Sequence, residues 1–226
     1  MATSSDAPKK DEDFFGLVGN VFKMYKDSWE ALKLNLVTFI ILALIPAILL
    51  AVAVPFILLP FVTDGGSLSS ILSFVVLLAL FVIACIFLPA LVVTQLESAK
   101  GNKIDINQVV ERSKPLVLPY IGLAIVLAVI FTIGFILLVI PGIIAVFFLS
   151  LSVYILVDKK VGVFDSIKQS YELTKANWQW VLALFIVQFA VSLVSYLPLI
   201  GWLLGIVLSI VYFCLPAIVY LKIVKK

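Results

Sequence analysis

Long apolar runs separated by short polar intervals set the pattern of this chain. A helix needs roughly 20 consecutive apolar residues to cross about 30 Å of hydrocarbon, and runs such as residues 34–60 exceed that length without the alternation of membrane β-strands. The sequence therefore predicts an all-α, polytopic membrane protein. The six expected transmembrane helices are 34–60, 67–96, 116–139, 142–157, 179–197 and 200–221. Turns at Gly65-Gly66, at Pro141-Gly142 and between Pro198 and Gly201 would join them as three hairpins.

The polar interval before each hairpin has the periodicity of an amphipathic helix. Its apolar positions step by 3, 4, 3 and 4 residues, which places them on one helical face. The three sets are Phe15, Val18, Phe22, Tyr25 and Trp29; Ile106, Val109, Ser113, Leu116 and Tyr120; and Phe164, Ile167, Tyr171, Thr174 and Trp178. Such helices beside a membrane span are expected to lie in the interface plane. In the middle copy, Asp105 and Gln108 have capping-box spacing, and Pro115 should end the helix early.

An amphipathic helix followed by a hairpin, three times over, predicts an internal threefold repeat. The repeat units are about 14–96, 104–157 and 163–222, in a single membrane domain (14–226) that follows a disordered cytoplasmic tail (1–13). Residues 88–92 (LPALV) resemble residues 215–219 (LPAIV), and residues 149–153 are a poorer copy without the proline. Coincidence in a composition-biased sequence is the alternative, against which the matched aromatic positions of the first and third intervals argue.

Charge adds an orientation to this pattern. The chain is 64% hydrophobic and 13% charged, whereas a soluble domain is about 45–50% apolar and about 25% charged. All 16 Lys and Arg residues lie before the first predicted span, between spans two and three, between spans four and five, or after the sixth. Asp64 is the one charge expected on the opposite side. Because excess Lys and Arg mark cytoplasmic loops, we expect a multi-pass inner-membrane protein with both termini in the cytoplasm.

Residues 141–181, PGIIAVFFLSLSVYILVDKKVGVFDSIKQSYELTKANWQWV, carry a family pattern. It comprises a Pro-Gly turn, a helix ending in an acid, and small residues and an aromatic at helical spacing: Pro141, Gly142, Asp158, Ser166, Ser170, Thr174 and Trp178. The segment resembles the six-helix membrane domain found next to glycerophosphoryl diester phosphodiesterases, and related, poorly characterised (UPF) bacterial membrane proteins of the YciC type. This family more often has Glu at the position of Asp158. The resemblance implies the six-helix layout and little about activity, and 226 residues leave no room for the soluble phosphodiesterase barrel.

The residue types that catalysis usually requires are scarce. The chain has no histidine, its two cysteines (Cys85 and Cys214) lie apart in apolar runs, and neither a glycine-rich phosphate loop nor a G-x-S-x-G turn occurs. We therefore expect no enzymatic activity, no cofactor and no metal site. The predicted spans also contain no Asp, Glu, Lys or Arg. Because such residues usually mark ion-coupled transport, an ion-driven pump is disfavoured.

Two groups of polar residues are candidate sites. Those at the cytoplasmic face are Glu97, Asp158, Ser166, Ser170, Thr174 and Trp178. Glu97 and Asp158 end the second and fourth spans, where they could pair with lysines or hold a ligand. Ser166, Ser170 and Thr174 form a ridge of small residues on one helical face, which close helix packing or a ligand contact would explain. Trp178 would anchor the next span. The intramembrane group is Gln188, Ser192 and Ser195, which indicates either interhelical hydrogen bonds or a lined cavity.

These features favour a non-enzymatic scaffold, a membrane-organising module or a lipid-associated support for a partner. The alternatives are a transporter or lipid-translocating protein with a path through the repeats, and a membrane-curvature protein that wedges one leaflet. The expected partners are the bilayer, anionic lipids at the cytoplasmic face, and a second protein or a second copy of the chain; nucleic acid is not expected. A polar cavity reaching mid-membrane would favour transport, and a closed apolar core with an exposed cytoplasmic groove would favour the scaffold.

Overall fold

The computed structural model describes residues 14–62, 67–194, 196 and 201–225, which form helices joined by short turns. The helices are α1 (Phe14–Leu34), α2 (Leu36–Val62), α3 (Ser67–Ala99), α4 (Ile106–Ser113), α5 (Val117–Leu137), α6 (Val139–Leu149), α7 (Ser152–Lys159), α8 (Val163–Ala176), α9 (Trp178–Val194), α10 (Gly201–Tyr212) and α11 (Leu215–Val224), with a 3-10 turn, η1 (Lys114–Leu116). No strand occurs in the described residues, which confirms the all-α class. The predicted tail 1–13 and the predicted turn at Gly65-Gly66 lie outside the described residues, as does most of the turn before Gly201.

Several helical stretches are long and apolar enough to cross a membrane. Among the described residues, four qualify by themselves: Leu36–Leu58, Ile106–Leu137, Val139–Lys159 and Val207–Val224. A fifth results if α8 and α9 are counted together, although these two helices meet at a bend of 92°. The second predicted span corresponds to α3, a helix of 33 residues. The chain is therefore a multi-pass helical membrane protein, while six crossings and a threefold repeat remain predictions.

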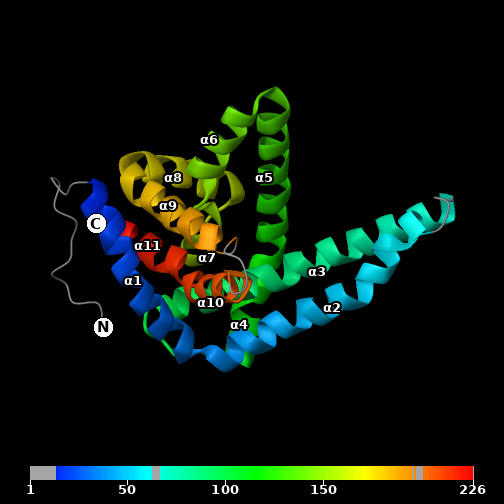
Figure 1. Cartoon of the computed structure of the whole chain (residues 1–226), viewed down its shortest axis with the longest axis horizontal. Coiled ribbons are helices and arrows are strands. Elements are labelled where there is room, and N and C mark those ends of the chain that lie inside the picture. The colour runs from blue at the N-terminus through cyan, green and yellow to red at the C-terminus, as the bar shows by residue number, and fades with distance from the viewer. Residues whose placement is uncertain (1–13, 63–66, 195, 197–200, 226) are drawn as a thin grey trace.

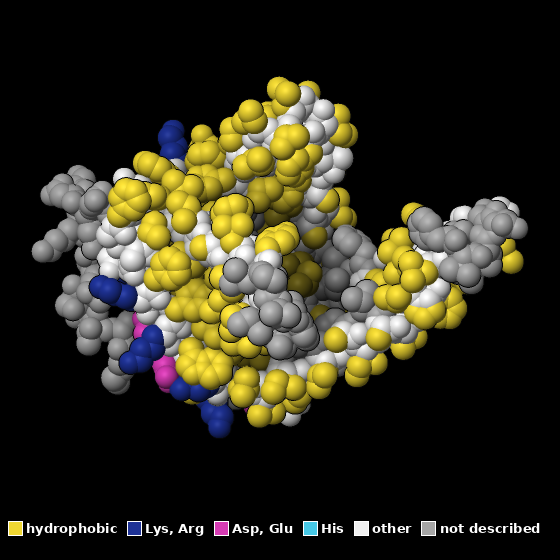
Figure 2. Space-filling view, in the orientation of Figure 1, with side chains coloured by type: hydrophobic (Ala, Val, Ile, Leu, Met, Phe, Trp, Pro, Cys, Tyr) yellow, Lys and Arg dark blue, Asp and Glu magenta, His cyan; other side chains and the backbone are white. Residues whose placement is uncertain are grey.

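The α2–α3 and α5–α6 hairpins project from the rest of the molecule in different directions (Figure 1). At their base, α1 packs against α3, α9, α10 and α11. One cluster of buried apolar side chains joins these elements, and Val21, Leu123, Ile155 and Val181 are fully enclosed within it. Both hairpins carry many exposed apolar side chains, whereas the charged side chains visible in Figure 2 gather mainly along α1.

The α5–α6 hairpin turns at a single residue. Leu138 has extended backbone angles (φ −168°, ψ 147°) between the end of α5 and the start of α6. The predicted turn at Pro141-Gly142 is therefore wrong, and both residues lie at the beginning of α6. Proline is tolerated there because the first helical N–H groups have no intrahelical acceptor. Gly142 instead permits a close helix approach, since a Cβ built on Gly134 would lie 3.0 Å from Gly142 Cα.

The second helix of two hairpins is interrupted near its charged end, and the continuous helix α3 of the remaining hairpin contains a proline. Pro89 lies inside α3, Ser150-Leu151 separates α6 from α7, and Phe213-Cys214 separates α10 from α11. Carbonyls freed by interruptions in a membrane must be satisfied by neighbouring side chains. The donors are Ser170 Oγ to Phe148 O (2.9 Å), Tyr25 Oη to Leu208 O (3.1 Å), Gln95 Nε2 to Phe213 O (3.0 Å) and Ser28 Oγ to Val211 O. Burial raises the pKa of Tyr25 from its ordinary value to about 12.

The helices α1 and α8 bury one face and expose aromatic side chains on another. Ser166, Ser170 and Thr174 of α8 are fully buried, whereas Phe164 and Tyr171 are exposed. The same division on α1 has Leu17, Val21, Met24, Ser28 and Ala31 buried and Phe15, Phe22 and Trp29 exposed. Thr174 lies at the buried edge of the predicted apolar face, because its small side chain packs closely together with Ser166 and Ser170, as the close-packing interpretation of these three residues predicts.

The middle polar interval does not form a helix separate from the span that follows it. The α-helical hydrogen bonding of α4 ends at Ser113, as Pro115 predicts. The 3-10 turn η1 then connects α4 to α5 without a bend large enough to separate them, so Ile106–Leu137 is one helical stretch. Pro115 lies at the start of η1, where the missing N–H costs no hydrogen bond. The expected capping-box bond from Asp105 N–H to Gln108 Oε1 is present at 3.4 Å. The interfacial orientation of this interval stays a prediction, and the interval differs from α8, which lies at 92° to α9, in being continuous with the span that follows it.

Candidate functional site

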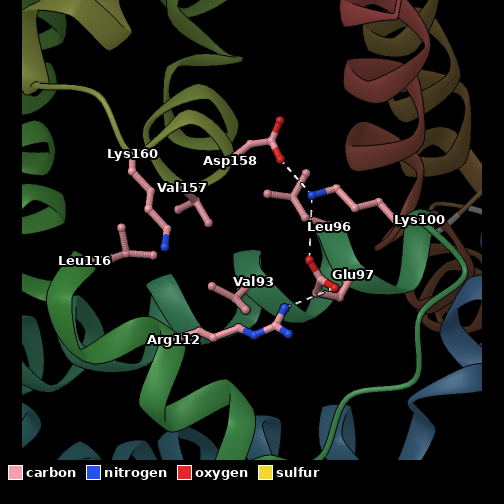
Figure 3. A pocket seen from close by; sticks show the side chains of 9 residues that line it. All are labelled: Val93, Leu96, Glu97, Lys100, Arg112, Leu116, Val157, Asp158 and Lys160. Carbon is pink, nitrogen blue, oxygen red and sulfur yellow. Dashed lines mark hydrogen bonds and ion pairs between the residues drawn. The ribbon is translucent and has the colours of Figure 1, made fainter.

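Glu97 and Asp158 lie on either side of one lysine. Glu97 is close to the C-terminal end of α3, Asp158 is close to the end of α7, and Lys100 follows α3. Lys100 Nζ is 2.8 Å from Asp158 Oδ1 and 3.6 Å from Glu97 Oε1 (Figure 3). The carboxylate side chains are only 16% and 18% exposed, so salt screens these charges less than it screens pairs on an open surface. The shared cation therefore joins the ends of two helices that are 58 residues apart in sequence.

Further bonds attach this pair of acids to α4 and α11. Arg112 Nη1 is 3.1 Å from Glu97 Oε2, to which Asn102 Nδ2 also donates at 3.0 Å. On the other side, Tyr220 Oη donates to Asp158 Oδ2 at 3.1 Å. We call Glu97, Lys100, Arg112, Asp158 and Tyr220 the charged cluster. It ties α3, α4, α7 and α11 together at one end of the molecule.

Two polar side chains extend this network toward the interruption between α10 and α11. The Tyr154 ring stacks on Tyr220, with centroids 5.8 Å apart. Its hydroxyl donates to Gln95 Oε1 at 3.2 Å, and Gln95 Nε2 donates to Phe213 O at 3.0 Å. The Gln95 amide and the Tyr154 hydroxyl are thus engaged in bonds between helices.

Asn35 holds the segment that follows α3. It lies between α1 and α2 and is 3% exposed. Its bonds are Nδ2 to Ser98 Oγ (2.8 Å), Nδ2 to Asn102 O (2.9 Å) and Ile104 N–H to Oδ1 (2.8 Å). A neighbouring bond from Thr38 Oγ1 to Ile104 O measures 3.1 Å. Both donors and the acceptor of one amide therefore fix the loop that carries Lys100.

A hollow of about 200 Å³ opens beside the charged cluster. Its apolar lining consists of Val93, Leu96, Leu116 and Val157, and its charged lining of Glu97, Lys100, Arg112, Asp158 and Lys160 (Figure 3). The Lys160 side chain reaches into this space and its ammonium group ends between Leu116 and Val157. Within the described part of the chain, no carboxylate or carbonyl is paired with that ammonium group. Lys160 also adopts left-handed backbone angles (φ 52°, ψ 37°) at the end of α7.

A second, more open hollow lies on the outer surface of α4. Its volume is about 310 Å³, and its lining residues are Asn107, Gln108, Glu111 and Arg112. Arg112 is shared with the first hollow. Both hollows therefore belong to the charged end of the molecule.

The remaining cytoplasmic candidates are not part of the charged cluster. Ser166 Oγ donates to Val163 O (2.7 Å) and Ser170 Oγ to Phe148 O, while Thr174 Oγ1 is buried without a partner among the described residues. Trp178 is exposed at the start of α9. None of these four candidates lines either hollow. The ridge packs α8 against its neighbours, and the structure does not bring it together with Glu97 and Asp158.

The intramembrane candidates are only partly described. Ser192 is exposed, and its Oγ donates to Gln188 O at 3.0 Å within α9. Gln188 Oε1 is buried and has no partner in the part of the chain that the structure describes. Ser195 lies outside the described residues. Neither of the two hollows is lined by these side chains.

Sequence reasoning missed the residues that complete the charged cluster. The charge pattern predicts only a cytoplasmic location for Lys100 and Arg112, and Tyr220 reaches Asp158 across 62 residues. For Lys100, the i, i+3 spacing from Glu97 is a local signal. No local pattern indicates the positive φ of Lys160, since glycine is the usual residue in that conformation.

Fold and site together define a helical, multi-pass membrane protein whose charged cluster joins the ends of several helices. The chain belongs to an uncharacterised protein family, UPF0259, whose sequence model matches residues 67–221. This match confirms membership of a UPF membrane family and includes the segment 141–181 on which the resemblance rested. The suggested relation to the membrane domain of the phosphodiesterases stays a prediction. No solved structure matches the chain.

Proposed function

We propose that this protein is a non-enzymatic scaffold of the inner membrane, with both termini in the cytoplasm, that organises lipids or supports a partner protein. The observation that carries the proposal is the placement of polar groups. The charged cluster and both hollows lie at one end, while the main buried cluster of the described residues consists of apolar side chains such as Leu123 and Ile155. An apolar core with charged groups gathered at one end suits a scaffold better than a conduit.

The outward-facing aromatic residues of α1 and α8 support a role at the membrane interface. Phe15 and Phe164 are 80% and 75% exposed, and aromatic residues beside basic ones favour the headgroup region. If α9 crosses the bilayer, the 92° bend places α8 along the membrane surface. α1 and α8 would then position the hairpins relative to the bilayer. A membrane domain of the phosphodiesterase-associated kind would similarly hold a soluble partner at the surface.

One observation favours the rival function, a transporter or lipid-translocating protein. Gln188 Oε1 is buried and has no partner among the described residues, and an unsatisfied polar group inside a membrane protein is a candidate contact for a transported molecule. Three other polar side chains argue against this role, because Gln95, Tyr154 and Ser170 are engaged in bonds between helices.

Mass spectrometry of the lipids and proteins that co-purify with the full chain in a mild detergent tests the proposal. We expect a reproducible protein or lipid partner above the level of a matched six-helix control protein, and no solute flux after reconstitution in liposomes. Finding neither partner, together with flux that Gln188→Leu abolishes, would replace the scaffold with the transporter. Tubulation of liposomes by the pure protein would instead identify the membrane-curvature function.

A further inference from the structure

We propose that the hollow beside the charged cluster binds a phosphate group, held by Lys160 and Arg112. Its charged lining comprises three cations (Lys100, Arg112 and Lys160) and two carboxylates (Glu97 and Asp158), which leaves one positive charge in excess. The inference deepens the proposed function by naming the chemistry of its ligand, and it rests on that function only for the membrane location of the hairpins.

The positive charge inside the hollow is not distributed evenly. Lys100 lies between both carboxylates, at 2.8 Å from Asp158 Oδ1 and 3.6 Å from Glu97 Oε1. Its charge is therefore neutralised by ion pairs within the protein. Arg112 is paired through Nη1 with Glu97, and the guanidinium group has further N–H donors. Lys160 has no paired carboxylate within the described residues. An anion entering the hollow would therefore meet the Lys160 ammonium and the free edge of Arg112.

The backbone at Lys160 argues that its side chain has a use beyond ending α7. A non-glycine residue in left-handed conformation costs about 1 kcal/mol or more, and glycine is the common residue after a helix end. A basic side chain can stabilise helix carbonyls at this place, but Lys159 already occupies the last turn of α7. The ammonium of Lys160 instead ends over the hollow, between Leu116 and Val157 (Figure 3).

The lining of the hollow fits an amphiphilic phosphate. Val93, Leu96, Leu116 and Val157 give it an apolar lining beside the cations. Arg and Lys are the side chains that bind phosphate oxygens most effectively, and basic pockets between transmembrane helices at the cytoplasmic surface suit lipid phosphates. The shared chemistry is a phosphate ester, carried either by a lipid headgroup or by a small soluble molecule.

Direct binding to the purified full chain, measured in detergent by native mass spectrometry, tests this site. Three probes are used. Dioctanoyl phosphatidic acid has both acyl chains and a phosphate group, sn-glycerol 3-phosphate has the phosphate group alone, and dioctanoylglycerol has the acyl chains alone. Lys160→Gly removes the ammonium group and suits the left-handed backbone, and Lys160→Asn is a second variant with the same aim. Lys159→Ala is the matched control, because Lys159 is a neighbouring exposed lysine that bonds to Gln169 Oε1 instead (2.9 Å).

We expect both Lys160 variants to weaken phosphatidic acid binding about fivefold, as the loss of one lysine near a phosphate implies, and Lys159→Ala to leave it unchanged. If glycerol 3-phosphate binds as tightly as phosphatidic acid, and the Lys160 variants weaken its binding by the same factor, the site is confirmed and its ligand is a soluble phosphate. Equal affinity for dioctanoylglycerol, or unchanged lipid binding in both Lys160 variants, would overturn the proposal. The scaffold function is judged separately by the partner that co-purifies with Lys160→Gly, so its failure is distinguishable from failure of the phosphate site.

Discussion

At the scale of single residues, Asn35 is the side chain on which the loop after α3 depends most. Its amide donates to Ser98 Oγ and Asn102 O and accepts from Ile104 N–H, all within 2.9 Å. Asn35→Ala would leave a buried backbone N–H without its acceptor, and such a loss costs about 1–3 kcal/mol. We expect a lower free energy of unfolding by about 2 kcal/mol, measured by thermal unfolding in detergent.

Asn107→Ala is the control for that experiment, because Asn107 is exposed on α4. Its midpoint of unfolding should match that of the original chain. An Asn35→Ala protein as stable as the control would show that the loop is held by other contacts. The sequence shows that Asn35 is an amide residue between two long helices. It does not show the hydrogen-bond partners of this amide, which lie 63 to 69 residues away.

At the scale of elements, substitutions on the two faces of α8 are expected to have different effects on stability. Ser170 is fully buried and donates to Phe148 O, whereas Phe164 on the same helix is 75% exposed. Ser170→Leu adds volume to a packed contact and removes that bond, so it should destabilise the protein by about 1–3 kcal/mol. Phe164→Leu should change stability in detergent by less than about 0.5 kcal/mol. Urea or thermal unfolding followed by circular dichroism measures both, and the reverse order of effects would show that α8 packs through its aromatic face.

The α5–α6 hairpin depends on the space that two glycines leave. A Cβ on Gly134 would lie 3.0 Å from Gly142 Cα, a backbone atom that cannot rotate away. Gly134→Ala should therefore separate the two helices and cost about 1–3 kcal/mol. Gly19→Ala in α1 is the matched control, since nothing lies within 4 Å of its added Cβ, and alanine should favour that helix by up to about 1 kcal/mol. Thermal unfolding midpoints that fall equally in both variants would contradict the close packing.

Sequence periodicity predicted most helices but not how their faces are oriented. Apolar runs and breaks correctly indicated α2, α3, α5 and α9, because membrane spans require uninterrupted hydrophobic length. The apolar periodicity of α8 does not show which side is packed, because beside a bilayer an outward apolar face is as favourable as a buried one and small residues mark the packed side. The turn at Leu138 was missed because proline and glycine also fit the first turns of a helix.

At the scale of the whole molecule, the charged cluster brings together residues that are far apart in the sequence and that share only a predicted cytoplasmic location. The pattern of 16 basic residues predicts one charged side, and the structure collects three of them around one hollow. Pairings such as Lys100 with Asp158 depend on how hairpins pack, which local spacing does not encode. The helical class and the two acids were therefore predictable, whereas the hollow and Lys160 were not.

Membrane topology is the prediction that concerns the entire chain. The positive-inside rule places Lys168 in the cytoplasm and the tip of the α5–α6 hairpin on the opposite side. In a background with Cys85→Ala and Cys214→Ala, we expect Leu138→Cys to react with an impermeant maleimide in intact spheroplasts. Lys168→Cys, on the exposed surface of α8, should react only after the membrane is opened, and it serves as the control for membrane integrity. Labelling of Leu138→Cys only after opening would mean that α5 and α6 enter and leave the membrane on one side, and it would reduce the six predicted crossings to four.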